Sequence, residues 1–262
     1  MVIFVENVVE TRSGRVSYSA FGSGAPLIIL HSLLTDHRAF DPVLERLGGR
    51  VIAMDLPGFG ATTPSEPTID SYAARVTDLI EALGIEPREV TLIGNGLGAF
   101  VALGVAIHNQ IGRLLLVGCG KSFPEEARQV FANMAEAVRA GGMEAVIPTA
   151  LRRIFTEDHL LHHPDAGAER AAVLRRTDAE AFMIACHALQ SVDYGAGAST
   201  IVVPTLIVVG QEDAATPPWM AEELHAVIPN SELVVIPGVA HAPQLQDPAR
   251  FMDIVTPFLE QR

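Results

Sequence analysis

The chain has 262 residues, of which 49% are hydrophobic and 19% are charged. This composition supplies a large buried core and argues against disorder, and one undivided α/β domain can reach this length. The formal net charge of −13 argues against a nucleic-acid partner, since binding a phosphate backbone needs a basic surface. The same charge disfavours binding to anionic membranes.

Residues 1–7 lack the basic segment and long apolar core of a secretory signal, so we expect no signal peptide. No apolar run approaches the ~20 residues that a transmembrane helix requires. The sequence contains two cysteines, Cys119 and Cys186. We therefore expect no structural disulfide and predict a reducing, cytoplasmic location.

Strands and helices alternate along the first 120 residues. Two antiparallel strands are predicted at 2–9 and 15–21, joined by a turn at residues 12–14. Apolar runs then predict buried strands separated by amphipathic helices. In chain order these are a strand at 27–30, a helix at 39–47, a strand at 51–54, a helix at 69–83, a strand at 90–93, a helix at 100–107 and a strand at 113–117. The alternation predicts an α/β fold with a mostly parallel central sheet and helices on both faces.

Between residues 121 and 200 the alternation stops, because this segment contains no convincing strand. Helices are expected there at 125–140, 143–155, 168–175 and 178–189. We interpret the segment as a helical cap inserted over the sheet. The alternation resumes with strands at 205–209 and 232–236 and helices at 218–227 and 248–259. The predicted organisation is a core formed by residues 1–120 and 201–262 and a helical cap formed by residues 121–200.

Residues 94–99 (Gly-Asn-Gly-Leu-Gly-Ala) lie between a predicted strand and a predicted helix, and two interpretations compete for them. As Gly-x-Gly-x-x-Ala they fit a dinucleotide-binding fingerprint. As Gly-x-Gly-x-Gly they fit a nucleophile elbow with Gly96 in the place of the serine. A dinucleotide site needs an acid at the end of the next strand, where this chain has Gly-Cys-Gly. An elbow needs an acid and then a histidine after later strands, and Asp213 and His241 follow in that order. We therefore favour the elbow.

Five motifs follow one another along the chain: His-Ser-Leu at 31–33, Asp-Leu-Pro-Gly-Phe-Gly at 55–60, Gly-Asn-Gly-Leu-Gly at 94–98, Gly-Gln-Glu-Asp at 210–213 and Gly-Val-Ala-His at 238–241. In this order they resemble an α/β-hydrolase along essentially the whole chain. Residues 31–36, 137–143 and 213–218 are most similar to the β-ketoadipate enol-lactone hydrolases. Two positions depart from the family: Gly96 stands where its members have serine, and Ser32 follows His31 where glycine is commoner.

The resemblance implies a role for each residue of the site. His241 is the general base, and Asp213 orients its ring and stabilises the imidazolium, although an Asp just before a predicted helix also fits a capping role. The backbone N–H groups of Leu33 and Leu97 form the oxyanion hole. The implied activity is that of a serine-type hydrolase of a carboxylic ester or lactone.

Gly96 decides what this chain can do with such a site. Glycine accepts a positive φ without strain, so the turn should form readily, but the acyl-enzyme route loses its hydroxyl. Three explanations remain open: an inactivated variant of a serine hydrolase, an enzyme in which His241 acts directly on water or substrate, and a non-catalytic protein that binds a small molecule. The second includes carbon–carbon bond hydrolysis or lyase chemistry. Ser32 is a candidate substitute nucleophile, although packing beside the oxyanion loop is the simpler role.

Several side chains are candidates for the substrate pocket. Phe123, Phe155 and Trp219 could line it, although aromatic residues at helical spacing are more often plain core. Arg152, in the pair with Arg153, could hold a substrate carboxylate, as could the pair at 175–176, although solvated helix surface is the simpler interpretation.

The sequence predicts neither a metal nor a cofactor. Three histidines, His159, His162 and His163, lie beside two aspartates, but a pair spaced i, i+4 without further fixed ligands is a weak metal signal. The expected partner is a small-molecule ester or lactone, and the oligomeric state is left open.

Overall fold

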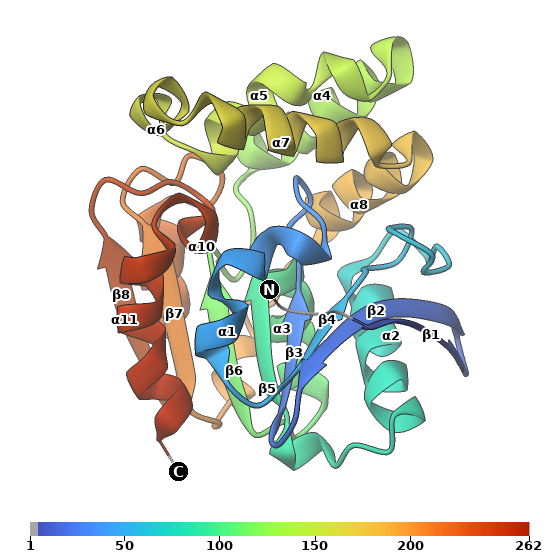
Figure 1. The fold of residues 1–262 in the computed structure, drawn as a ribbon, viewed down its shortest axis with the longest axis vertical. Helices are drawn as coiled ribbons and strands as arrows, with labels where there is room; N and C mark the ends of the chain where they lie inside the picture. Colours follow the sequence, from blue (N-terminus) through green and yellow to red (C-terminus); the bar gives the residue numbers. More distant parts are fainter. Residues whose placement is uncertain (1–4, 262) are drawn as a thin grey trace.

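The computed structural model describes residues 5–261, which form an eight-stranded sheet flanked by helices (Figure 1). The strands are β1 (Val5–Thr11), β2 (Gly14–Gly22), β3 (Pro26–Leu30), β4 (Arg50–Met54), β5 (Thr91–Asn95), β6 (Arg113–Val117), β7 (Thr205–Gly210) and β8 (Ser231–Ile236). Their order in the sheet is β1-β2-β4-β3-β5-β6-β7-β8. The pairs β1–β2 and β2–β4 are antiparallel, and the other pairs are parallel. The predicted mostly parallel sheet is confirmed. Residues 2–4 of the first predicted strand lie outside the described residues.

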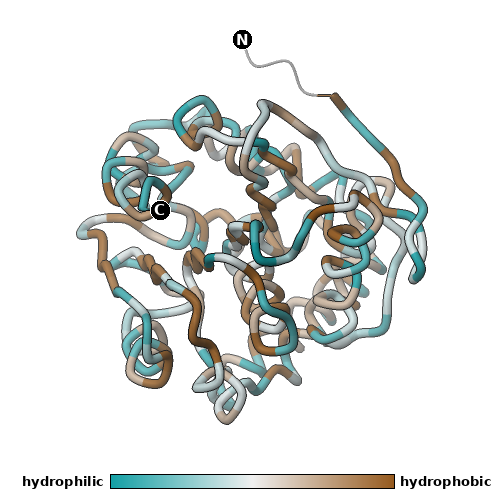
Figure 2. The backbone as a smooth tube through the Cα atoms, turned by 90° about the horizontal axis from the view of Figure 1, so that it is seen from below, coloured by the Kyte–Doolittle hydropathy of each residue, from teal (hydrophilic) through white to brown (hydrophobic). Residues whose placement is uncertain are grey.

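The central strands are apolar on both faces because helices cover both faces. In β3, Ile28 and Leu30 belong to a core shared with α2 (Ile69–Ala82), α3 (Leu97–His108) and α9 (Pro218–His225). Leu27 and Ile29 point to the other side, into a second core shared with α1 (Leu44–Leu47) and α11 (Pro248–Glu260). Viewed from below, hydrophobic stretches run through the interior of the molecule and hydrophilic ones lie mostly outside (Figure 2).

Two short elements differ from the predicted pattern in the core. The helix predicted at 39–47 is a 3-10 helix, η1 (His37–Val43), followed by one turn of α1. Pro42 lies inside η1, and its missing N–H interrupts the hydrogen-bond ladder that an α-helix needs. The four-residue α10 (Pro243–Gln246) precedes α11 and was not predicted, since its length is too short for a periodic signal. No helix within residues 5–261 is long and apolar enough to cross a membrane.

Five helices and two 3-10 turns connect β6 to β7, and all of these except the second 3-10 turn, η4 (Ala198–Thr200), lie as one layer over the end of the sheet (Figure 1). The elements of this layer are α4 (Glu125–Gly141), η3 (Met143–Ala145), α5 (Ile147–Ile154), α6 (Glu157–His162), α7 (Pro164–Arg176) and α8 (Ala179–Ser191). We call α4–α8 the helical layer. The predicted start of the third helix, at 168, was wrong: α7 begins at Pro164, because proline is well tolerated in the first turn of a helix. The prediction also missed α6.

Asp55, just after β4, connects three segments of the core. Its carboxylate accepts a hydrogen bond from Ser17 Oγ at 2.7 Å and is paired with His37 Nδ1 at 2.6 Å, and its carbonyl accepts one from Thr62 Oγ1 at 2.8 Å. Burial opposes both charges, but the pairing outweighs it, so the pKa of Asp55 is lowered and the pKa of His37 is raised. Asp55 is therefore a structural residue of the fold.

We predict that Asp55→Asn lowers the free energy of unfolding by about 3 kcal/mol, as expected when a buried ion pair loses one partner. The contribution of Asp55 is present above its unfolded pKa and is lost as the pH falls through its lowered folded pKa. The contribution of His37 is present below its unfolded pKa and is lost as the pH rises through its raised folded pKa. The penalty should therefore be largest between about pH 4 and pH 6.5. Urea unfolding across this range measures it, and a penalty that does not change with pH would contradict the ion pair.

Candidate active site

A sharp turn joins β5 to α3 and places Gly96 at the carboxyl end of the sheet. Gly96 has φ +54° and ψ −116°, a conformation that L side chains rarely adopt. Its N–H donates to the Val117 carbonyl at 2.9 Å, and the N–H of Gly98 donates to the His31 carbonyl at 3.0 Å. A Cβ on Gly98 would lie 2.2 Å from the Leu30 carbonyl oxygen, so only glycine permits this approach to β3. The local geometry is that of the predicted strand–turn–helix elbow.

Asp213 and His241 meet beside this turn, as the sequence predicted. Asp213 follows β7, His241 follows β8, and both side chains are buried. The distance from Asp213 Oδ2 to His241 Nδ1 is 2.8 Å. Asp213 Oδ1 also accepts hydrogen bonds from the backbone N–H groups of Ala215 and Thr216, and Asp213 Oδ2 accepts one from Thr216 Oγ1 at 2.8 Å. These donors fix the carboxylate, which in turn orients the imidazole ring.

Two further polar residues hold the histidine loop and were not predicted. Asn95 Nδ2 donates to the His241 carbonyl at 3.0 Å and to the Val117 carbonyl at 3.2 Å. Gln244 Nε2 donates to Asn95 Oδ1 at 3.1 Å, and both side chains are fully buried. The one signal in the sequence was the polar Asn95 at the end of an otherwise apolar strand.

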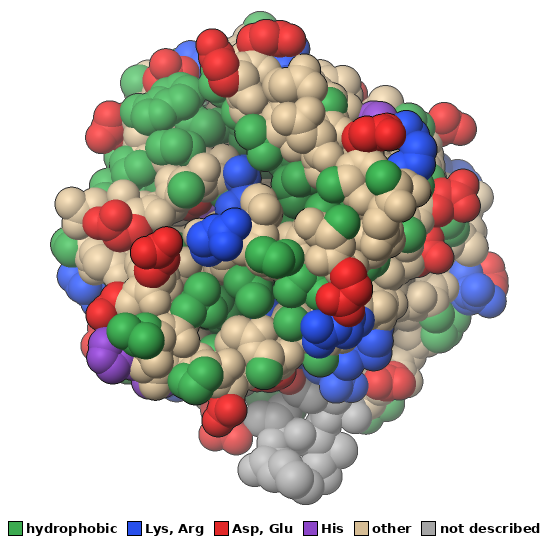
Figure 3. Space-filling model, turned by 90° about the horizontal axis from the view of Figure 1, so that it is seen from above, with side chains coloured by type: hydrophobic (Ala, Val, Ile, Leu, Met, Phe, Trp, Pro, Cys, Tyr) green, Lys and Arg blue, Asp and Glu red, His purple; other side chains and the backbone are tan. Residues whose placement is uncertain are grey.

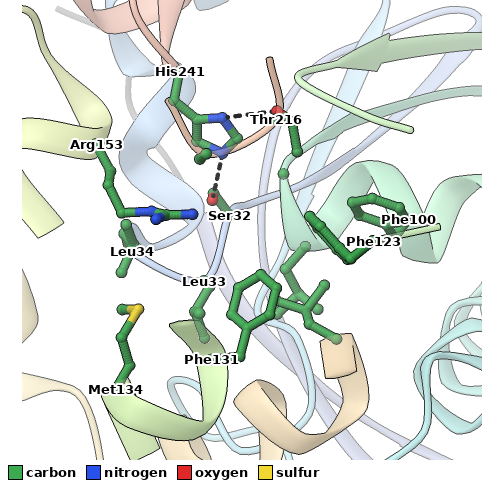
Figure 4. A pocket seen from close by; sticks show the side chains of 14 residues that line it. Ser32, Leu33, Leu34, Phe100, Phe123, Phe131, Met134, Arg153, Thr216 and His241 are labelled. Carbon is green, nitrogen blue, oxygen red and sulfur yellow. Dashed lines mark hydrogen bonds between the residues drawn. The ribbon is translucent and has the colours of Figure 1, made fainter. Parts of the chain in front are cut away.

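The Ser32 hydroxyl lies between the turn and His241. Its Oγ is hydrogen-bonded to His241 Nε2 at 3.4 Å (Figure 4). A Cβ on Gly96 would lie 2.4 Å from Ser32 Oγ and 2.6 Å from His241 Nε2. The residue at position 96 and Ser32 therefore compete for one space in front of the ring.

Leu33 and Leu97 both line the cavity at this point. Leu97 is the first residue of α3, so the helix itself leaves its N–H without a partner. Within residues 5–261, neither the Leu33 N–H nor the Leu97 N–H has an acceptor. Both amides remain able to donate to a ligand, as an oxyanion hole requires.

A narrow pocket with a cavity volume of about 30 Å³ lies between the helical layer and the end of the sheet. From the sheet side it is lined by Ser32, Leu33, Leu34, Gly96, Leu97, Phe100, Ala215, Thr216 and His241. From the helical side it is lined by Phe123, Phe131, Met134, Arg153 and Leu189. The wall is mostly apolar, and its few polar groups gather near His241, as is usual for a small-molecule site (Figure 4).

Three residues predicted for the pocket do not line it. Phe155 is buried in the core beyond α5, where its ring stacks on His159 with centroids 4.9 Å apart. Trp219 is 44% exposed at the start of α9. Arg152 is exposed, whereas its neighbour Arg153 lines the pocket, because consecutive helical residues point about 100° apart. Of the predicted substrate contacts, the structure places Ser32 and Phe123 in the pocket wall.

Arg153 brings a positive charge into this apolar wall. Its side chain is partly buried and points into the pocket (Figure 4), and no hydrogen bond or ion pair to it is found among the described residues. Burial lowers the pKa of the Arg153 guanidinium, an effect that the negative charge of Asp213 partly offsets. Seen from above, hydrophobic side chains and a few basic ones are exposed near the middle of this face, and acidic and further basic side chains lie around its edge (Figure 3). The guanidinium is available to an anionic ligand.

Of the three histidines, His159 and His162 lie in α6 and His163 follows it directly. The rings of His159 and His163 are 4.6 Å apart. Burial and the neighbouring His163 lower the pKa of His159. Among the described residues, no group of three His, Cys, Asp or Glu side chains is arranged to hold a metal ion.

Comparisons with known proteins agree with this geometry. Residues 27–254 match a family described as the Alpha/beta hydrolase family. The 3-oxoadipate enol-lactonase 1 of Acinetobacter baylyi is 27% identical over 241 residues, covering 90% of this chain and 89% of that protein. A pimeloyl-(acyl-carrier protein) methyl ester esterase of Neisseria meningitidis is 30% identical over 247 residues, covering 88% of this chain and 92% of that protein. The crystal structure of the enol-lactonase from Burkholderia xenovorans has the same fold, with a TM-score of 0.91 at 24% identity over 97% of this chain and 100% of that one.

We predict that Thr216→Val disturbs His241 without displacing it. The substitution removes one donor to Asp213 Oδ2 and leaves the two backbone donors on Oδ1, so the unfolding free energy should fall by about 1 kcal/mol. Asp213 Oδ2 would then accept from His241 alone, and the low-field NMR signal of the His241 Nδ1 proton should move further downfield. Asp213→Asn should abolish that signal. An unchanged signal in Thr216→Val would show that Thr216 does not tune the pair.

Proposed function

The chain belongs to the alpha/beta hydrolase family, and we propose that its pocket takes a small carboxylic ester or lactone. The carbonyl of this substrate lies between His241 and the N–H groups of Leu33 and Leu97. The observation that supports the proposal most directly is the 2.8 Å hydrogen bond between Asp213 and His241 Nδ1. It leaves His241 Nε2 facing position 96, where a Cβ would lie 2.6 Å from this nitrogen. Hydrolase names among the relatives support an ester-type bond as the target.

Each group of the site has a chemical role in this proposal. His241 Nε2 takes a proton from an oxygen nucleophile and later gives it to the leaving group. Asp213 fixes the ring tautomer, with the proton on Nδ1, and stabilises the imidazolium. Two backbone donors hold the developing oxyanion, each worth about 2.7–4 kcal/mol. Because Gly96 carries no hydroxyl, no acyl-enzyme forms at position 96 and turnover is strongly reduced.

The helical layer acts in this proposal as the cap of a hydrolase. In this proposal, residues 121–200 form the cap and residues 1–120 and 201–262 form the core, a division suggested by the loss of strand alternation in the sequence. The pocket supports this division, since one wall comes from each part. The cytoplasmic location stays a prediction; it is compatible with Cys119 and Cys186, which are both free and buried.

We predict that Gly96→Ser raises the hydrolysis of 4-nitrophenyl acetate, or of a simple enol lactone, on the order of 10³-fold above that of Gly96→Ala. Both variants place a Cβ at φ +54°, so both should lose about 1–3 kcal/mol of stability. In both, the Ser32 hydroxyl at 2.4 Å and the His241 Nε2 at 2.6 Å from that Cβ must shift. The comparison therefore isolates the hydroxyl. Steady-state rates and thermal unfolding measure the two effects.

One outcome would overturn the enzymatic proposal. If folded Gly96→Ser hydrolyses no activated ester or lactone faster than Gly96→Ala, while small carboxylic esters still raise the Tm of the unchanged chain, the pocket is a binding site only.

The guanidinium of Arg153, which has no partner within residues 5–261, favours substrates with a carboxylate beyond the reacting ester. A carboxylate in the apolar pocket would pair with Arg153, and a charge-assisted contact of this kind is worth about 1.5–3 kcal/mol.

We predict that Arg153→Gln, made in the Gly96→Ser variant, lowers kcat/KM for a carboxylate-bearing ester about 10- to 100-fold relative to a neutral ester of the same size. Arg152→Gln is the matched control, since it removes the adjacent, exposed arginine. Equal losses on both esters, or equal effects of both variants, would remove Arg153 from substrate recognition.

A further inference from the structure

We propose that Ser32 is the nucleophile of this chain and that its Oγ forms the acyl-enzyme which Gly96 cannot form. The inference rests on the proposed hydrolysis of an ester or lactone in this pocket. In this proposal, the chain with Gly96 hydrolyses esters slowly, and the attacking hydroxyl comes from the loop after β3 and not from the turn after β5.

The Ser32 hydroxyl occupies the space that a side chain at position 96 would need. Ser32 Oγ lies 2.4 Å from the Cβ that any residue other than glycine would have at position 96. This is far inside the contact distance of two heavy atoms, so a side chain at 96 and the present Ser32 conformer exclude one another. Gly96 therefore opens the space in front of His241, and the Ser32 hydroxyl fills it.

His241 is placed to accept the proton of the Ser32 hydroxyl. Ser32 Oγ is 3.4 Å from His241 Nε2, a distance that can shorten when substrate binds. The other ring nitrogen is held by Asp213. The nearby Thr216 hydroxyl is on that other side of the ring and donates to Asp213. Among the described residues, Ser32 is the hydroxyl that is hydrogen-bonded to Nε2.

The N–H groups of Leu33 and Leu97, the expected oxyanion donors, also suit an attack by Ser32. In an elbow, one donor is the N–H of the residue directly after the nucleophile. Leu33 stands in that relation to Ser32, as Leu97 does to position 96, and both N–H groups border the pocket without an acceptor among the described residues. A carbonyl attacked by Ser32 would thus meet the same pair of donors.

The loop that carries Ser32 is also held firmly. The Ser32 N–H donates to Thr35 Oγ1 at 3.1 Å, and the Thr35 N–H donates to the Ser32 carbonyl at 3.2 Å. His31 Nε2 accepts the Leu56 N–H at 3.1 Å, so its Nδ1 carries the proton and donates to the Ser32 carbonyl at 2.9 Å. Burial lowers the pKa of His31 and keeps this ring neutral. The backbone that carries the hydroxyl is therefore held in place, which favours a fixed position of Ser32 Oγ beside His241.

The reaction follows the usual two halves of acyl transfer. Ser32 Oγ bonds to the carbonyl carbon while its proton passes to His241 Nε2. The tetrahedral oxyanion collapses, the bond to the leaving alkoxide breaks, and His241 returns the proton to that oxygen. Water, deprotonated by His241, then attacks the acyl-Ser32 ester and releases the acid, which restores the Ser32 hydroxyl.

Covalent labelling tests the proposal directly. A small alkyl fluorophosphonate, which loses fluoride to an activated serine, should add to the unchanged chain, and peptide fragmentation should place the adduct on Ser32. Ser32→Ala should lose the adduct and the slow hydrolysis of 4-nitrophenyl acetate together. His241→Gln should lower both rates by at least about 10²-fold. Ser199→Ala is the matched control, because it removes a hydroxyl bonded only to the Ala196 carbonyl on the surface.

The Gly96→Ser variant separates failure of this proposal from failure of the proposed function. If Gly96→Ser is labelled at position 96 and hydrolyses esters, while the unchanged chain has no adduct at Ser32 or Ser32→Ala keeps its slow rate, Ser32 is not the nucleophile and His241 acts on water. If neither form is labelled or hydrolyses any ester, the hydrolase proposal itself fails, and the Ser32 proposal with it. Thermal unfolding of Ser32→Ala confirms that a lost adduct does not reflect a lost fold.

Discussion

The hydrogen bond between Asp213 Oδ2 and His241 Nδ1, 2.8 Å long, determines what the rest of the site can do. A buried carboxylate is costly unless its oxygens are satisfied, and Asp213 receives two backbone N–H groups and the Thr216 hydroxyl besides the imidazole. With Nδ1 committed to this bond, Nε2 must face the pocket. The bonds from Asn95 to the His241 carbonyl and from Gln244 to Asn95 then hold the whole loop beside the β5–α3 turn.

The space in front of His241 Nε2 is the second constraint on the site. The presence or absence of a Cβ at position 96 decides which side chain occupies it. The turn at Gly96 has φ +54°, and the N–H groups of Gly96 and Gly98 anchor it through hydrogen bonds to the Val117 and His31 carbonyls. A serine at position 96 would supply a hydroxyl, but it would strain the backbone and displace Ser32. With glycine, the strain disappears and the β3 loop supplies the hydroxyl. In the proposed mechanism, the two arrangements use the same base, His241, and the same backbone donors, Leu33 and Leu97.

The fold and the meeting of Asp213 with His241 could be predicted from the sequence because both leave local signals. Buried strands read as apolar runs, and Asp213 and His241 follow their strands in a set order. The prediction failed where the answer depends on which way a side chain points. Arg152 and Arg153 are indistinguishable in the sequence, yet α5 turns only the second into the pocket. Phe155 and Trp219 were expected in the pocket wall, but Phe155 points into the core and Trp219 toward solvent. The role of Gln244 could not be predicted, because its partner Asn95 lies in a distant segment of the chain.

The charge of the whole chain and the charge of the pocket act over different distances. A net charge of −13 repels an anionic substrate, but salt screens this repulsion beyond about 8 Å at physiological ionic strength. Inside the pocket the nearest charges are Arg153 and Asp213, and the carboxylate of Asp213 is already shared among four donors. In the proposed function, the partly buried guanidinium of Arg153 is therefore the positive charge that a bound carboxylate meets. An acidic protein can hold an anion here because the recognition is local.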